Sequence, residues 1–158
     1  MVSSGDPASC SHKSRRRIVL GLVGIPLVVT QISTVRASTD QPVAHLSDLS
    51  KPWSAVKFTL PDTDGSDMPC IVIRLPGDKW YASTLICPHN KCTIMFVSDL
   101  DMARDSFNVE TSTPVLACPC HFSVFDPAQN GRVIGGPAPN PPLQLRVELR
   151  GNDVFVSR

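Results

Sequence analysis

Short apolar runs separated by turn-forming residues dominate the chain from residue 53 onward. The runs are three to seven residues long and are rich in Val, Ile, Leu and aromatic residues, which is typical of strands rather than of helices. They cover residues 56–60, 70–75, 80–86, 93–97, 115–117, 143–149 and 154–156. The pattern predicts an all-β fold of antiparallel strands.

An earlier apolar run, residues 18–29, follows directly after Arg15, Arg16 and Arg17. A charged region followed by an apolar core is typical of an export signal, and residues 14–20 resemble the twin-arginine consensus, which directs folded proteins across a membrane. Small side chains predict cleavage after Ala37. Alternatively, residues 18–35 stay as an anchor helix, because 18 residues just reach the length of about 17 to 25 that a spanning helix needs. In both cases we expect the body on the periplasmic side of the membrane.

Composition and length add limits to this picture. The 158 residues have room for one domain and a short extra segment. A net charge of +1 argues against a nucleic-acid partner, and 15 prolines argue against a helical bundle. We expect a signal or anchor over residues 1–37, a linker at 38–52 that is a tether or a strand edge, and the domain at 53–158. Within the domain, residues 61–67 resemble a calcium loop only superficially and predict a solvated hairpin turn.

Four of the six cysteines and two of the four histidines lie in two short motifs. The motifs are Cys87-Pro88-His89-Asn90-Lys91-Cys92 and Cys118-Pro119-Cys120-His121-Phe122-Ser123. Each offers a thiolate and an imidazole close enough together to bind one metal centre. Two thiolates and two imidazoles suit zinc, or an iron–sulfur cluster in which histidines replace two thiolates. In an oxidising compartment, the remaining Cys92 and Cys120 are well placed to form a disulfide.

These motifs closely resemble the Rieske 2Fe-2S pattern, Cys-x-His-x-x-Cys followed by Cys-x-Cys-His-x-Ser, and the resemblance covers residues 43–158. It implies an antiparallel β-sandwich with two cluster-binding loops. Cys87 and Cys118 would bind the buried iron, and His89 and His121 the outer iron. The resemblance also implies a Cys92 to Cys120 disulfide, which Rieske ferredoxins usually lack.

Two further residues bear on the potential of the cluster. Ser123 matches a family serine whose hydroxyl donates to a cluster sulfur. Phe125 stands where many high-potential members carry a tyrosine that donates to a ligand sulfur. The resemblance therefore implies one hydrogen-bond donor fewer and a lower potential.

Two kinds of Rieske subunit are similar to this chain. Residues 135–142 are rich in proline and predict a loop, and the Gly-Gly-Pro-Ala-Pro stretch at 135–139 resembles the loop that covers the cluster in quinol-oxidising proteins. That implies a cytochrome bc-type quinol:cytochrome c oxidoreductase, with a cytochrome b-type partner, a quinol and a c-type cytochrome as acceptor. Residues 122–126 and the strand at 69–73 instead resemble the small subunit of arsenite oxidase, which implies a molybdenum partner. Asn90 and Lys91 depart from both, which commonly have an apolar residue and then glycine, so we expect a more polar docking tip.

The sequence shows no nucleophile and base pair beside these residues, so we expect an electron-transfer subunit rather than a catalyst on its own. A binding module stabilised by zinc on Cys87, His89, Cys118 and His121 is the remaining alternative. Cys70 lies in an apolar run, which predicts a buried free thiol, and His45 lies in polar sequence, which predicts solvation. Cys10 precedes the arginines, so it is not expected to bind a lipid.

Overall fold

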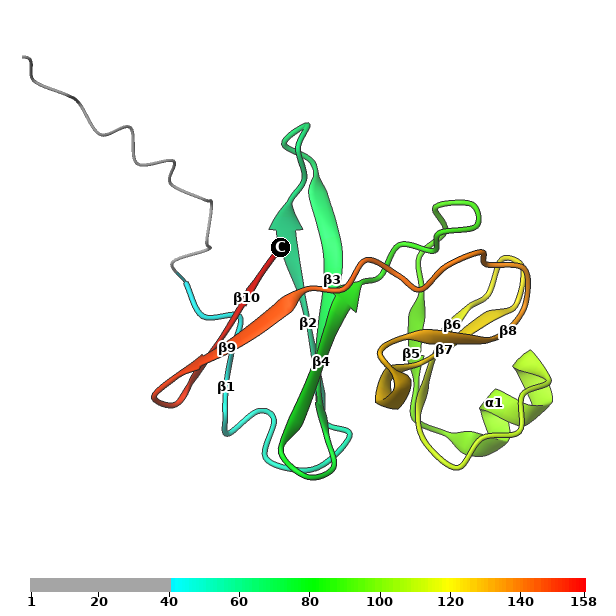
Figure 1. Ribbon diagram of the computed structural model, residues 1–158, viewed down its shortest axis with the longest axis horizontal. Coiled ribbons are helices and arrows are strands. Elements are labelled where there is room, and N and C mark those ends of the chain that lie inside the picture. Colours follow the sequence, from blue (N-terminus) through cyan, green and yellow to red (C-terminus); the bar gives the residue numbers. More distant parts are fainter. Residues whose placement is uncertain (1–40) are drawn as a thin grey trace, which may run out of the picture. The chain divides into compact units, whose positions relative to one another are not determined.

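A central antiparallel sheet organises the protein, whose computed structural model describes residues 41–158 (Figure 1). Its strands are β2 (Ala55–Pro61), β3 (Asp67–Leu75) and β4 (Lys79–Thr84), in the order β2-β3-β4. The β2–β3 connection is a tight turn in which Gly65 has φ 82°, and the side chains of Asp62 and Asp64 accept backbone N–H bonds from Thr63 and Ser66. The predicted hairpin turn is therefore present.

The middle strand β3 is buried on both faces. Ile71 and Ile73 belong to one core cluster, whereas Cys70 and Val72 belong to another. Successive side chains of a strand point to opposite faces of the sheet. The central sheet thus separates two cores, and this explains why residues 70–75 form a continuous apolar run rather than an alternating one.

Two further sheets, of three and four strands, supply the other walls of these cores. One has the order β1-β10-β9 and contains β1 (Ala44–His45), β9 (Arg146–Arg150) and β10 (Asp153–Ser157). The other has the order β5-β6-β7-β8 and contains β5 (Met95–Val97), β6 (Val115–Cys118), β7 (Ser123–Asp126) and β8 (Arg132–Gly135), with a 3-10 turn at Pro127–Gln129. Every ladder is antiparallel.

A helix, α1 (Leu100–Phe107), covers the outer side of the four-stranded sheet. Asp99 begins it by accepting the N–H groups of Asp101 and Met102, and Asn108 ends it in the left-handed conformation. Ala103 and Phe107 pack one helical turn apart against the sheet. The sequence patterns did not predict this helix.

The predicted antiparallel all-β fold is confirmed. All seven apolar runs overlap strands, and the structure adds β1, β7, β8 and α1 to them. Within the expected linker at 38–52, β1 pairs with β10 and Leu49 is fully buried, so the part from Ala44 to Leu49 packs on the domain. The expected leader lies outside the described residues. Among residues 41–158, no helix has the length and apolar character needed to cross a membrane.

Candidate metal centre

The two cysteine–histidine motifs form loops that close with the same backbone turn. In residues 87–92, the Lys91 N–H donates to the Cys87 carbonyl at 2.9 Å; in residues 118–123, the Phe122 N–H donates to the Cys118 carbonyl at 3.0 Å. The residue four positions after the first cysteine is left-handed in both loops, with φ 57° at Lys91 and φ 58° at Phe122. The two loops therefore share one local geometry. Neither has glycine at its left-handed position, although glycine adopts this conformation most easily.

The thiols of these loops are buried, whereas the imidazoles are exposed. Cys87 and Cys118 are each 1% exposed, and neither forms a disulfide. His89 and His121 are exposed, and their rings meet edge to face with centroids 4.6 Å apart. The structure thus brings one histidine from each loop together at the surface, while one cysteine from each loop is buried.

A disulfide between Cys92 and Cys120 joins the two loops, as the sequence and the resemblance led us to expect. Their α-carbons are 6.5 Å apart. The sulfur of Cys118 lies within 4.8 Å of both disulfide sulfurs, and in the described part of the chain this is the trio whose ligand atoms are that close together. A centre of two irons spreads its four ligands over two metal positions, so the four predicted ligand atoms need not fit around one ion.

The buried cysteine pair favours a positively charged occupant. Burial raises the pKa of the Cys118 thiol, and the adjacent Cys87 thiol raises it further, whereas the backbone N–H groups of Cys120 and His121 lower it. The N–H groups are already oriented towards the sulfur, so the charge that they would stabilise is a thiolate. Iron ions would supply the positive charge that allows the buried Cys118 thiol to bind as a thiolate.

Ser123 gives an independent indication of what lies between the loops. Its side chain is fully buried, and its Oγ accepts the Ala138 N–H at 3.1 Å. This bond uses a lone pair of the hydroxyl and leaves its own proton to be donated elsewhere. A buried donor without an acceptor costs about 1 to 3 kcal/mol. The sulfur atoms of a 2Fe-2S cluster would accept such a bond, so the residues present fit this group.

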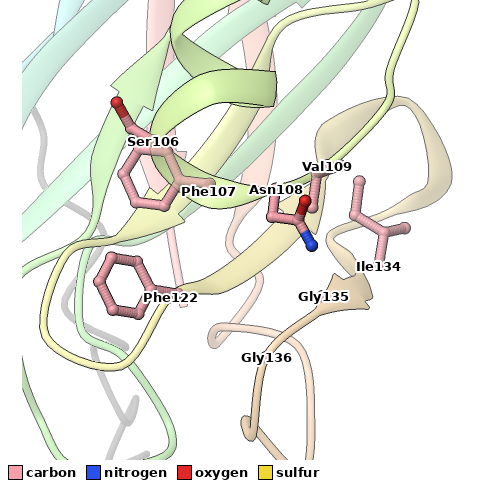
Figure 2. A pocket seen from close by; sticks show the side chains of 8 residues that line it. All are labelled: Ser106, Phe107, Asn108, Val109, Phe122, Ile134, Gly135 and Gly136. Carbon is pink, nitrogen blue, oxygen red and sulfur yellow. The ribbon is translucent and has the colours of Figure 1, made fainter.

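The contact between Phe122 and helix α1 was not predicted from the sequence. This residue, 55% exposed, contacts Phe107 of α1 edge to face, with ring centroids 6.2 Å apart. Figure 2 shows the two rings at one side of a pocket of about 550 Å³ that Gly135 and Gly136 line on the other side. In the sequence, Phe122 stands directly after His121 and begins the stretch 122–126, but neither signal indicates a contact with α1.

The residues predicted to lie outside the site do so, apart from Cys10, which is not among the described residues. Cys70 is a buried free thiol in β3, and His45 is exposed and pairs with Asp153 in the β1-β10-β9 sheet. Phe125 is fully buried in the core cluster that contains Cys87 and Cys118, and its side chain has no polar atom to donate.

The fold and this site define an iron–sulfur electron-transfer protein. The model of the Rieske [2Fe-2S] domain matches residues 39–151, and the chain belongs to this family, whose domain binds a 2Fe-2S cluster. One similar curated protein is the iron–sulfur subunit of the cytochrome b6-f complex of Chlorobaculum tepidum. It is 28% identical over 87 residues, which are 55% of this chain and 40% of that subunit. The match therefore spans less than half of the relative's length.

Solved structures agree on the fold. The plasma membrane Rieske protein of the cyanobacterium Synechocystis PCC 6803 matches with a TM-score of 0.53 and 22% identity, over 75% of this chain and 99% of that one. The soluble domain of Rieske protein II from Sulfolobus acidocaldarius matches with a TM-score of 0.55 and 18% identity, over 73% of this chain and 75% of that one. At these identities the likeness concerns the fold alone.

Proposed function

We propose that this Rieske protein is the electron-transfer subunit of a cytochrome bc-type quinol:cytochrome c oxidoreductase, with Cys87, His89, Cys118 and His121 as the cluster ligands. The observation that carries the ligand assignment is the separation of a buried cysteine pair from an exposed histidine pair within two disulfide-linked loops. The cluster supplies a one-electron centre, and with two histidine ligands its potential is about −150 to +300 mV.

Each residue of the site has a distinct task in this function. The two cysteines fix the inner side of the centre in the core, where water does not reach. The two exposed imidazoles form the side that a partner can approach, and an imidazole nitrogen is able to hold a proton when the centre gains an electron. The Cys92 to Cys120 disulfide keeps both loops at one spacing during docking and release.

Spectroscopy of the purified protein tests the ligand assignment. Iron and sulfide analysis should give two of each per chain, and electron paramagnetic resonance should detect the reduced cluster. Replacing His89 or His121 by Cys should keep iron but lower the potential, because a thiolate adds negative charge to the centre. A colourless protein that contains zinc would overturn the assignment.

The choice of complex rests on two observations. The similar subunit from Chlorobaculum tepidum belongs to a cytochrome b6-f complex, and the Gly-Gly-Pro-Ala-Pro stretch at 135–139 resembles the loop of quinol-oxidising proteins. The second candidate is a molybdenum enzyme of the arsenite oxidase kind, which the sequence of residues 122–126 favours. Purification of the native complex separates them: haem b supports the first candidate, and molybdopterin supports the second and excludes the first.

The docking tip adds detail to the first candidate. Besides histidines, Lys91 is the one residue with a formal charge in the segments 87–92, 118–123 and 136–143, and Asn90 and Lys91 are both exposed. We hypothesise that this polar tip changes how a quinol docks. Asn90→Leu in the assembled complex should change the KM for quinol, and unchanged quinol turnover would count against the hypothesis.

The proposal also includes export by the twin-arginine route to the periplasmic side. The leader is then either cleaved or kept as an anchor. Export by this route is supported by Arg15 and Arg16 ahead of the apolar run at 18–29. Replacing both arginines by lysine should leave the cluster-loaded protein in the cytoplasm. Normal export of that variant would refute this part of the proposal.

A further inference from the structure

The proline-rich loop holds the Ser123 hydroxyl by a bond across 15 residues. The Ala138 N–H donates to Ser123 Oγ at 3.1 Å, and both residues are buried. A hydroxyl has one proton to donate and two lone pairs. Because the Ala138 N–H occupies one lone pair, the direction in which the hydroxyl can point its proton is restricted.

Ser123 lies directly opposite Cys118, a proposed cluster ligand. The two residues are antiparallel partners across the β6–β7 ladder. Side chains of directly opposite residues lie on the same face of a sheet, with β-carbons about 4.5 to 5.5 Å apart. The hydroxyl and the proposed ligand sulfur therefore share one side of the ladder.

Gly136 allows the proline-rich loop to come this close. A β-carbon at Gly136 would lie 2.4 Å from the Phe122 carbonyl oxygen and 2.5 Å from the Ser123 α-carbon. Both are backbone atoms of the second cluster loop, so they cannot rotate away as a side chain would. Gly136 also has φ 77°, which disfavours any side chain. Substitution here must push the two backbones apart, two residues before the Ala138 N–H.

We propose that Gly136 and Ala138 are positioning residues for the redox centre: the close approach at Gly136 places the Ala138 N–H against Ser123 Oγ, and this directs the hydroxyl proton to a cluster sulfur. A donor to a cluster sulfur stabilises the reduced, more negative state. The proline-rich loop thereby sets the midpoint potential without a ligand of its own. The inference rests on the ligand assignment proposed above.

A double-mutant cycle tests the coupling. Protein-film voltammetry would give the midpoint potentials of the wild-type protein, Ser123→Ala, Gly136→Ala and the double variant, with cluster content checked by electron paramagnetic resonance. We expect both single variants to lower the potential and the double variant to fall no further than Ser123→Ala, because both act through one hydroxyl. Additive shifts, or a Gly136→Ala potential equal to wild type with a full cluster, would overturn the proposal.

Gly65→Ala is the matched control. Gly65 also has a positive φ, 82°, but no atom lies within 4 Å of its β-carbon position, in the turn between β2 and β3. It reproduces the conformational cost of the substitution without the contact, so its potential should equal that of the wild type. A shift as large as that of Gly136→Ala would contradict the proposal.

A second variant covers the case in which Gly136→Ala loses its cluster. Ala138→Pro removes the N–H donor itself and should lower the potential; an unchanged potential would overturn the inference. If neither loop variant keeps a cluster, pulsed electron paramagnetic resonance of the wild type in D2O decides. An exchangeable proton strongly coupled to the cluster and lost in Ser123→Ala supports the proposal, and its absence refutes it. A wild-type protein without iron would instead refute the ligand assignment.

Discussion

Removing the disulfide between Cys92 and Cys120 should destabilise the domain by an amount set mainly by chain entropy. The bond joins residues 28 positions apart. For a ring of that size, closure removes about 3.6 kcal/mol of conformational entropy from the unfolded chain near room temperature. Whole domains are stable by roughly 5 to 15 kcal/mol. The double variant Cys92→Ser with Cys120→Ser should therefore lose a large share of its stability.

Guanidinium denaturation followed by circular dichroism measures this loss. Iron-free protein is the appropriate sample, because cluster release would make unfolding irreversible. We expect a lower midpoint and also a steeper dependence on denaturant, since the unfolded chain without the bond exposes more surface. Reduction of the wild-type disulfide is the matched control and should reproduce both changes.

A loss below about 1 kcal/mol with an unchanged denaturant slope would refute this reasoning. It would mean that the loops are held by their own hydrogen bonds, such as those from Lys91 to Cys87 and from Phe122 to Cys118. In that case the disulfide would hardly restrict the unfolded chain.

Three further predictions follow from single residues. Lys91→Gly should stabilise the protein by about 0.5 to 1 kcal/mol, because the left-handed conformation costs residues other than glycine about 1 to 2 kcal/mol. Part of this gain is offset by the greater freedom of glycine in the unfolded chain. Lys91→Ala should show no gain in the same thermal denaturation, and an equal gain would contradict the argument. Burial raises the pKa of Cys70 from 9.0 to about 11, so the neutral thiol contributes stability that is complete below pH 9 and lost as the pH rises through 11, about 2 to 3 kcal/mol in all. Denaturation at pH 8 and 11 should show a smaller drop for Cys70→Ala than for the wild type, and equal drops would exclude Cys70 as the cause. Phe125→Tyr should raise the midpoint potential by on the order of 60 mV if the added donor is worth about 1.4 kcal/mol more to the reduced state; lower stability with an unchanged potential would show that the hydroxyl does not reach a ligand sulfur.

The strands could be predicted because burial on one or both faces leaves a direct pattern in the sequence. Residues 70–75 read as a buried run, and β3 is buried on both sides. Helix α1 could not be predicted in this way, since its buried positions are only Ala103 and Phe107 among polar residues. Its signals were the capping residues Asp99 and Asn108 rather than a hydrophobic pattern.

The site, too, has features that the sequence predicts and features that it does not. The residue types and spacing of the two motifs predicted the disulfide and indicated a metal centre. The contact of Gly136 with Phe122 and the bond from Ala138 to Ser123 join segments that are separated in sequence. Such contacts depend on how β7, β8 and the proline-rich loop pack, and no local pattern encodes them.

The repeated turn of the two loops has a consequence for protein design. Cys87 and Cys118 begin five-residue turns of one geometry, each closed by a single backbone hydrogen bond and each ending in a left-handed residue. The histidine, however, stands two positions after the cysteine in one turn and three positions after it in the other. The backbone of the site is therefore symmetric where its side chains are not. A pair of such turns, joined by one disulfide, is a compact unit to graft onto another antiparallel scaffold, and shifting a histidine by one position within a turn would re-aim its ring while leaving the backbone unchanged.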